Sequence, residues 1–144
     1  MSATVDANVL LYASDAASPR HTAARHLVEG LAAGPDLVYL FWPALIAYLR
    51  IATHPGVFAR PLDPAQVQGN VASLIGRPHV RTPGEGTDFW SRYEEMVEGH
   101  SVRGNLVPDA HLAALMRSFG VSTIWTADRD FHRFPGITVR NPFA

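Results

Sequence analysis

The sequence contains no cysteine and no lysine. Without cysteine, the chain has no disulfide, no thiolate nucleophile and no Cys-ligated metal, and this composition fits a reducing compartment. Without lysine, it has no P-loop phosphate site, no Schiff-base chemistry and no lysine-assisted aspartyl-phosphate chemistry. All 12 basic residues are therefore arginines.

The sequence also lacks an excess of charge of either sign and lacks a long apolar run. The 12 basic residues nearly cancel the 13 acidic ones, so nucleic-acid binding would depend on local patches, and the small net charge favours self-association. No apolar run approaches the roughly 18 residues of a membrane span, and no basic leader precedes the first apolar segment. We therefore expect a soluble, cytoplasmic protein without a membrane partner.

The 144 residues are 47% hydrophobic, which is enough for a core and predicts one domain over residues 1–144. Short apolar runs alternate with runs of helical period. We expect strands near 4–5, 37–41, 79–81, 122–126 and 137–140, and helices over 9–13, 20–33, 43–50, 64–75, 88–98 and 108–119. Residues 127–136 should form a loop, and Trp90 should pack inward. Strands separated by helices predict an α/β fold, a three-layer α/β/α arrangement with a central, mainly parallel sheet.

Four carboxylates stand out because of their places at the ends of these elements. Asp6 follows the first strand, Asp109 lies in the first turn of the 108–119 helix, and Asp128 and Asp130 follow the strand that ends at Thr126. In a parallel sheet, the ends of the strands and the starts of the following helices share one edge, so these side chains are expected to converge.

Converging carboxylates repel one another unless a cation lies between them. A set of hard oxygen ligands favours Mg²⁺, or Mn²⁺, over zinc. Such a cation activates water and stabilises charge on a phosphodiester, which predicts metal-assisted phosphodiester hydrolysis. Asn8 and Thr126 are candidates to orient a carboxylate or a water from behind the ligands.

Each carboxylate taken alone has a structural explanation. Asp109 fits the start of a helix, Asp128 and Asp130 fit a polar turn, and Asp6 fits a helix cap. Only their joint placement favours a functional site.

Four segments in this order resemble the PIN-domain ribonuclease toxins of the VapC type: Val5–Leu10, Leu49–Thr53, Gly104–Ala114 and Thr126–Phe131. The resemblance covers essentially the whole chain. It implies a PIN-like fold and a Mg²⁺-dependent endoribonuclease toxin, usually a homodimer, that is inhibited by a VapB antitoxin. It also implies that Asp6, Asp109 and Asp128 bind the metal, with Asp130 as a further acidic member.

One position departs from the family pattern. The family places a Glu on the helix after the second strand, just before an aromatic-Leu-Arg element, and here Ala47 fills that position before Tyr48, Leu49 and Arg50. No Asp or Glu occurs from residue 37 to 62. Either a Glu-to-Ala change makes a toxic nuclease tolerable to its host, or the member is naturally weakened. We expect the chain to be weakly active or inactive.

Arginine and histidine side chains are candidates for contacts with RNA phosphates, because guanidinium groups suit phosphate oxygens. These candidates are Arg50, Arg103, Arg129, Arg133, His111 and His132. Two alternatives stay open. The absent Glu also fits a catalytically silent PIN domain that binds RNA or antitoxin without turnover. An aspartyl-phosphate phosphatase built on Asp6 is disfavoured, because Asn8 stands where a second acid is expected and lysine is absent.

Overall fold

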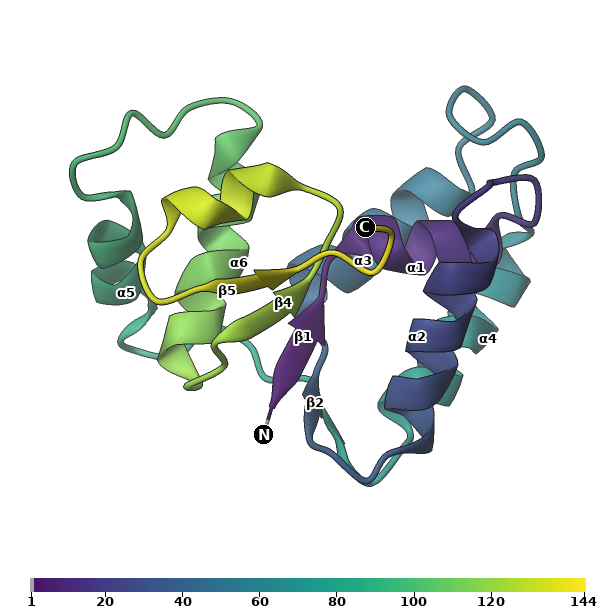
Figure 1. Cartoon of the computed structure of the whole chain (residues 1–144), viewed down its shortest axis with the longest axis horizontal. Coiled ribbons are helices and arrows are strands. Elements are labelled where there is room, and N and C mark those ends of the chain that lie inside the picture. Colours follow the sequence, from purple (N-terminus) through teal and green to yellow (C-terminus); the bar gives the residue numbers. More distant parts are fainter. Residues whose placement is uncertain (1) are drawn as a thin grey trace.

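The computed structural model describes residues 2–144 and contains a five-stranded, fully parallel sheet of order β3-β2-β1-β4-β5 (Figure 1). The chain first builds outward on one side of β1 and then returns to pair β4 with its other edge. The place where the winding reverses, between β1 and β4, is where open α/β sheets form a crevice. The strands are β1 (Ala3–Val5), β2 (Val38–Tyr39), β3 (Val80–Arg81), β4 (Thr123–Trp125) and β5 (Thr138–Arg140).

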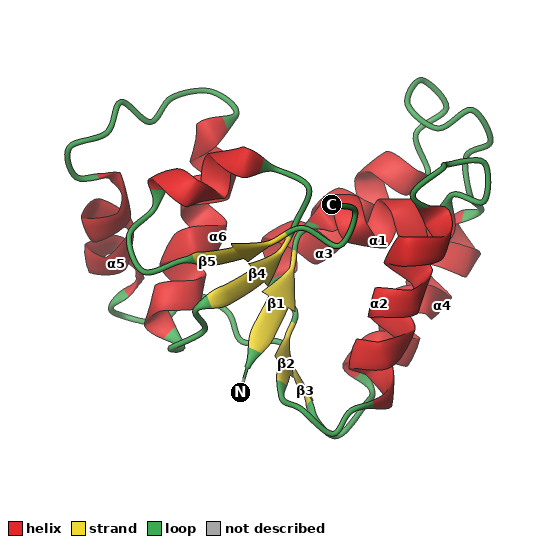
Figure 2. Ribbon diagram, in the orientation of Figure 1, coloured by secondary structure: helices red, strands yellow, loops and turns green. Residues whose placement is uncertain are grey.

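Helices connect the strands and lie on both sides of the sheet, giving the three-layer arrangement (Figure 2). They are α1 (Ala7–Ser14), α2 (His21–Ala33), α3 (Trp42–Ala52), α4 (Pro64–Ile75), α5 (Phe89–Val97), α6 (Leu106–Ser118) and the 3₁₀-helix η1 (Arg129–Arg133). The α/β prediction is confirmed. Parallel strands need long connections, and here most of these connections contain two helices.

The alternation of side chains along the strands divides the core into two layers. Val5 and Val38 pack in one cluster with residues of α1 to α4, whereas Tyr39 and Ile124 pack in the other with residues of α5, α6 and η1. Neighbouring residues of a strand point to opposite faces, so short strands supply both layers. The sheet thus fixes α1 and α6 on either side of its central strands.

Several boundaries differ from the sequence-based expectation. The helix expected from Pro108 begins at Leu106, because a proline in the first turn removes only an N–H that has no helical partner. The segment 127–136 is not only loop, because it contains η1, whose Phe131 is fully buried. The prediction that Trp90 packs inward is wrong, since 64% of this residue is exposed.

Within residues 2–144, we find no helix with the length and apolar character that a membrane crossing requires.

Candidate metal centre

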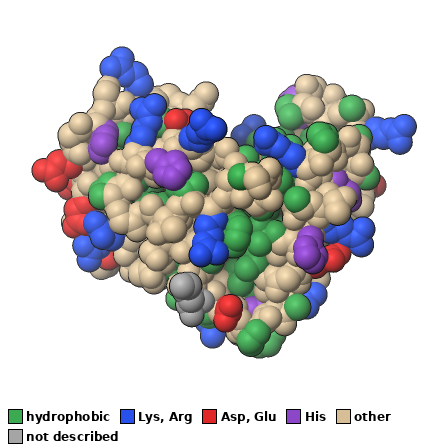
Figure 3. All heavy atoms as spheres, in the orientation of Figure 1, with side chains coloured by type: hydrophobic (Ala, Val, Ile, Leu, Met, Phe, Trp, Pro, Cys, Tyr) green, Lys and Arg blue, Asp and Glu red, His purple; other side chains and the backbone are tan. Residues whose placement is uncertain are grey.

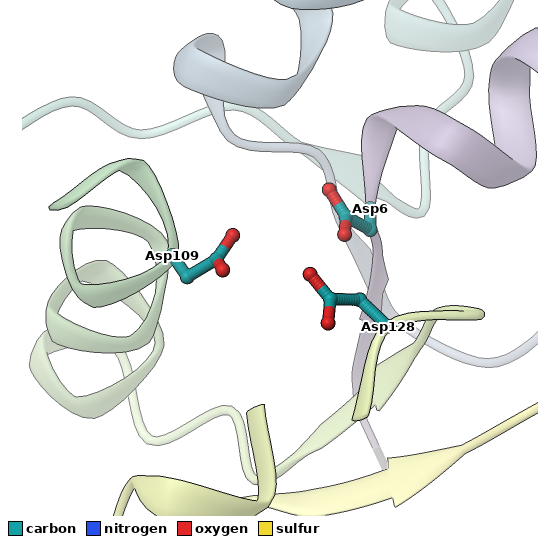
Figure 4. Close-up of side chains that lie close together, drawn as sticks. All are labelled: Asp6, Asp109 and Asp128. Carbon is teal, nitrogen blue, oxygen red and sulfur yellow. The ribbon is translucent and has the colours of Figure 1, made fainter. Parts of the chain in front are cut away.

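Three aspartates meet at the reversal point of the sheet (Figure 4). Asp6 follows β1, Asp128 follows β4, and Asp109 reaches them from the first turn of α6. One carboxylate oxygen from each lies within 4.8 Å of the others. All three side chains are half-buried, so the group remains open to solvent. The spacing and the pure oxygen donor set fit a hard divalent cation.

The first carboxylate is held by the helix that it caps and by the neighbouring strand. Asp6 Oδ1 accepts the N–H of Ala7 at 2.7 Å, which satisfies a free donor at the start of α1. Its other oxygen, Oδ2, accepts a hydrogen bond from the hydroxyl of Thr126 at 2.9 Å and lies 3.3 Å from the amide nitrogen of Asn8. One oxygen of Asp6 thus remains tied to the two residues predicted to orient it.

Thr126 links the ends of β1 and β4 through a fully buried hydroxyl. Its oxygen accepts the backbone N–H of Asp128 at 3.0 Å and the side-chain amide of Asn8 at 3.2 Å. Asp128 in turn accepts the N–H of Asp130 at 2.8 Å and caps η1. The side chains of Asp6 and Asp128 are therefore placed by one continuous hydrogen-bond network, which limits their freedom to separate.

Burial and mutual repulsion raise the pKa values of Asp109 and Asp6. Burial, followed by the negative charges of Asp128, Asp6 and Asp130, raises the pKa of Asp109 from 3.8 to about 7. Burial is also the main cause that raises the pKa of Asp6, against the hydrogen bond from Thr126, which lowers it. A cation bound among these groups would favour their charged forms and reverse these shifts.

Asp130 stands beside the group of three and is not part of it. Its charge contributes to the raised pKa of Asp109, yet its side chain is directed toward Arg133, whose Nε lies 3.6 Å from Asp130 Oδ1. Asp130 therefore affects the electrostatics of the site from its rim.

The other residues predicted from the sequence lie outside the carboxylate group. Ala47 is half-buried on α3, beside the buried Tyr48. Arg50, Arg103 and Arg129 are exposed, as are Arg133 and His132. Arginine side chains lie on both sides of a notch that opens between the two halves of the molecule in Figure 3. The strands point toward this notch (Figure 1).

His111 has a partner, Glu85, that was not predicted from the sequence. Its Nε2 lies 2.6 Å from Glu85 Oε1, and its ring packs edge-on against Phe89. The hydrogen bond with His111 lowers the pKa of Glu85. The pair fastens the connection between β3 and α5 to α6, close to the turn that carries Asp109. Because Glu85 is far from His111 in the sequence, no local spacing pattern could identify the pair.

A cavity of about 370 Å³ lies elsewhere, between α1, α2, α3 and α4. The hydroxyl of Tyr48 lines it and contacts Ser14 Oγ at 2.8 Å and Asn70 Nδ2 at 3.0 Å. None of the clustered aspartates lines this cavity. Its position separates it from the carboxylate group.

Comparisons with known proteins agree with this geometry. The model of the PIN domain family matches residues 3–137. The chain is 50% identical over 144 residues to ribonuclease VapC48 of Mycobacterium tuberculosis, covering 100% of this chain and 99% of that protein.

Two solved structures share the fold. The sarcin-ricin-loop-cleaving toxin VapC20 of M. tuberculosis superimposes with a TM-score of 0.64 at 22% identity, covering 94% of this chain and 98% of that one. A toxin-antitoxin complex from Klebsiella pneumoniae gives a TM-score of 0.64 at 17% identity, with 98% of both chains covered.

Proposed function

The chain belongs to the PIN-domain family, in its VapC group, and on this premise we propose that it is a metal-dependent endoribonuclease toxin of a toxin–antitoxin pair. The observation that carries the proposal is the meeting of Asp6, Asp109 and Asp128 at the reversal point of the sheet. The name of its relative VapC48, a ribonuclease, supports the same reaction class.

The proposed cofactor is Mg²⁺, with Mn²⁺ able to replace it. Both ions prefer carboxylate oxygens, and the three grouped side chains offer only such donors. The bound ion would lower the pKa of a coordinated water and stabilise negative charge on the phosphodiester. Asp6, Asp109 and Asp128 would hold the ion, and Asp130 would add negative charge at the rim.

The remaining residues of the site position the ligands and the substrate. Thr126 and Asn8 hold Asp6 in place, and Thr126 also fixes the backbone of Asp128. Arg50, Arg103 and Arg129 would contact RNA phosphates from exposed positions, since one guanidinium group can donate two parallel hydrogen bonds to a phosphate. His111 would contact RNA only at the expense of its pairing with Glu85.

We also propose that activity is reduced because Ala47 supplies no carboxylate. Fewer negative ligands hold a cation less tightly and leave its reactive water less well oriented. A silent domain that binds RNA or antitoxin without turnover is the second candidate, and the same alanine is the observation that favours it.

The proposed partners are RNA and a VapB-type antitoxin, and the proposed state is a cytoplasmic homodimer. A structural neighbour is a toxin-antitoxin complex, which supports the antitoxin. Two large apolar residues one turn apart on α3, Trp42 and Ile46, are 39% and 55% exposed, which supports self-association.

Cleavage of RNA by the purified chain tests the proposed activity. Transfer, ribosomal and messenger RNA are incubated with the protein in Mg²⁺ and, in parallel, in EDTA. We expect cleavage at defined sites in Mg²⁺ only, and none by Asp128→Asn. The exposed Asp36, changed to Asn, is the matched control and should leave cleavage unchanged. Cleavage that continues in EDTA, or survives Asp128→Asn, would contradict the proposal.

The Ala47→Glu variant separates a weakened enzyme from a silent domain. If Ala47 limits activity, the variant should cleave the same sites faster by about ten-fold or more, because the loss of one group that supports a metal site changes affinity or activity by 10–100-fold. Ala47→Gln is the control, since it adds similar volume without charge. Equal cleavage by both variants and the parent would show that position 47 does not limit the reaction. Cleavage by none of them would favour the silent domain.

A further inference from the structure

A second pocket lies at the far end of α1 from the carboxylates, between the connection that follows α1 and the connection that follows α3. These two connections lie beside each other at one shoulder of the molecule (Figure 1). The pocket has a volume of about 470 Å³, and its lining includes Ser14, Asp15, Phe58, Arg60 and Leu62. We call it the shoulder pocket.

The wall formed by the connection after α3 is ordered by its own hydrogen bonds. The N–H of Phe58 donates to the carbonyl of His54 at 3.2 Å, and the N–H of Leu62 donates to the carbonyl of Ala52 at 2.9 Å. Phe58 and Leu62 are half-buried and pack against the core, so each is anchored on one side. The pocket is therefore built before any ligand arrives, which lowers the entropy lost on binding.

The charges at its rim favour one kind of occupant. Arg60 is exposed, and within the described part of the chain its guanidinium has no hydrogen bond or ion pair. Asp15 lies at the other rim, where its negative charge repels a phosphate. A flat group with apolar faces would fit between them, with a phosphate beside Arg60. A nucleobase with its attached phosphate meets this description.

The pocket lies within reach of an RNA strand held at the carboxylates. Helix α1 has eight residues and rises about 1.5 Å per residue, so its ends lie about 12 Å apart. Asp6 caps its first end, and Ser14 and Asp15 form its last. Stacked nucleotides advance about 3.4 Å each, so this length corresponds to about three or four stacked nucleotides and fewer extended ones.

We propose that the shoulder pocket binds one base of the RNA, stacked on Phe58, with its phosphate beside Arg60, about two to four nucleotides from the bond at the carboxylates. The placement relative to the cut bond rests on the proposed ribonuclease function. Binding of the base itself does not require cleavage. The pocket would thus select how the strand lies across the site.

Binding without metal tests the pocket apart from the reaction. The full chain is titrated in EDTA against a fluorescein-labelled, single-stranded RNA 12-mer of randomised sequence, followed by anisotropy. Phe58→Leu keeps the apolar packing but removes the ring face, and should weaken binding by about 5- to 140-fold, the range for one stacked base. Phe58→Trp keeps a ring and should bind within about two-fold of the parent.

Two further variants complete the binding test. Arg60→Ala should weaken binding and reduce the slope of log Kd against log salt by about one, as expected for one lost phosphate contact. Val57→Ala, in the same connection and 60% exposed, does not line the pocket and should bind like the parent. Thermal unfolding confirms that each variant is folded. If folded Phe58→Leu binds RNA like the parent, the proposal is overturned. It is also overturned if this variant keeps RNA binding and loses only its binding to a co-expressed antitoxin.

Cleavage locates the base along the strand. An RNA that the parent cleaves is prepared as a series in which each member lacks one base, about two to four nucleotides from the cut. At one of these positions, loss of the base should slow cleavage by the parent and should not change cleavage by Phe58→Leu. If the parent cleaves and no position responds, the pocket proposal fails while the proposed function stands. If neither the parent nor Ala47→Glu cleaves any RNA, the proposed function fails, and the titration in EDTA still decides whether the pocket binds a base.

Discussion

Replacing Asp109 with Asn should stabilise the metal-free protein above neutral pH. In the parent, burial and the charges of Asp128, Asp6 and Asp130 raise the pKa of Asp109 from 3.8 to about 7. A carboxyl whose folded pKa lies above its unfolded value favours folding below the unfolded value and loses that contribution as pH rises through the folded one. The loss of folding stability caused by Asp109 therefore develops between about pH 4 and pH 7 and is complete above about pH 7.

The size of the effect follows from the shift. Roughly three pKa units correspond to about 4 kcal/mol at 1.36 kcal/mol per unit. Asp109 is half-buried, so solvent screening reduces the figure, and we expect about 2 kcal/mol. For a chain of this length, 1 kcal/mol shifts Tm by about 3 °C, which predicts a rise of about 6 °C for Asp109→Asn at pH 8. At pH 4 the two proteins should be nearly equal in stability.

Thermal and urea unfolding in EDTA, from pH 4 to pH 8, measures this difference. Asp36→Asn, a change at an exposed carboxylate outside the cluster, is the control and should shift Tm little at any pH. Added Mg²⁺ should then reverse the order, because binding at 100 times Kd stabilises the parent by about 2.7 kcal/mol and the variant far less. An Asp109→Asn protein that is less stable than the parent at pH 8 in EDTA would show that the charge of Asp109 does not destabilise the metal-free fold.

Two further predictions concern the residues around the cluster. Thr126→Val removes a buried hydroxyl that forms hydrogen bonds with Asp6, Asn8 and the backbone N–H of Asp128. This change should lower the free energy of unfolding by about 1–3 kcal/mol and weaken Mn²⁺ binding, measured by calorimetry, by about 10–100-fold. Thr126→Ser keeps the hydroxyl and should restore both quantities. Equal Mn²⁺ affinity in the valine variant would contradict this role. Glu85→Gln should destabilise by at most about 1 kcal/mol, because both partners are partly exposed. Since His111 lowers the pKa of Glu85, this difference should be present above pH 4.5 and fade in urea titrations as pH falls below it; a difference that persists at pH 3 would contradict the pairing.

The architecture was largely predictable because it depends on local patterns. Runs of helical period between short apolar segments predict a parallel α/β sheet, and the structure confirms it. The 3₁₀-helix at Arg129–Arg133 was not predicted, because its stability depends on the buried Phe131 and on the cap from Asp128. The prediction that Trp90 packs inward was wrong, because the helical spacing of an aromatic residue does not show whether another element covers it.

The site was predictable in outline for a topological reason. Strand ends of a parallel sheet share one edge, so Asp6 and Asp128 were expected to meet Asp109, and the structure places their oxygens together. Their role as metal ligands stays a prediction. The place of Asp130 outside the group was not predicted, because it follows from the unpredicted η1 turn, which directs this side chain toward Arg133. The pairing of Glu85 with His111 was not predictable, because it depends on how a distant loop packs.

A crystal of the protein soaked in Mn²⁺ and measured for anomalous scattering would show whether the three aspartates bind a metal ion. We predict one strong peak whose ligands include an oxygen from each of Asp6, Asp109 and Asp128, at distances near 2.1 Å. In crystals of Asp109→Asn grown in the same way, the peak should weaken or vanish. A peak bound elsewhere, or none among these three carboxylates at millimolar Mn²⁺, would show that Asp6, Asp109 and Asp128 do not form a metal site.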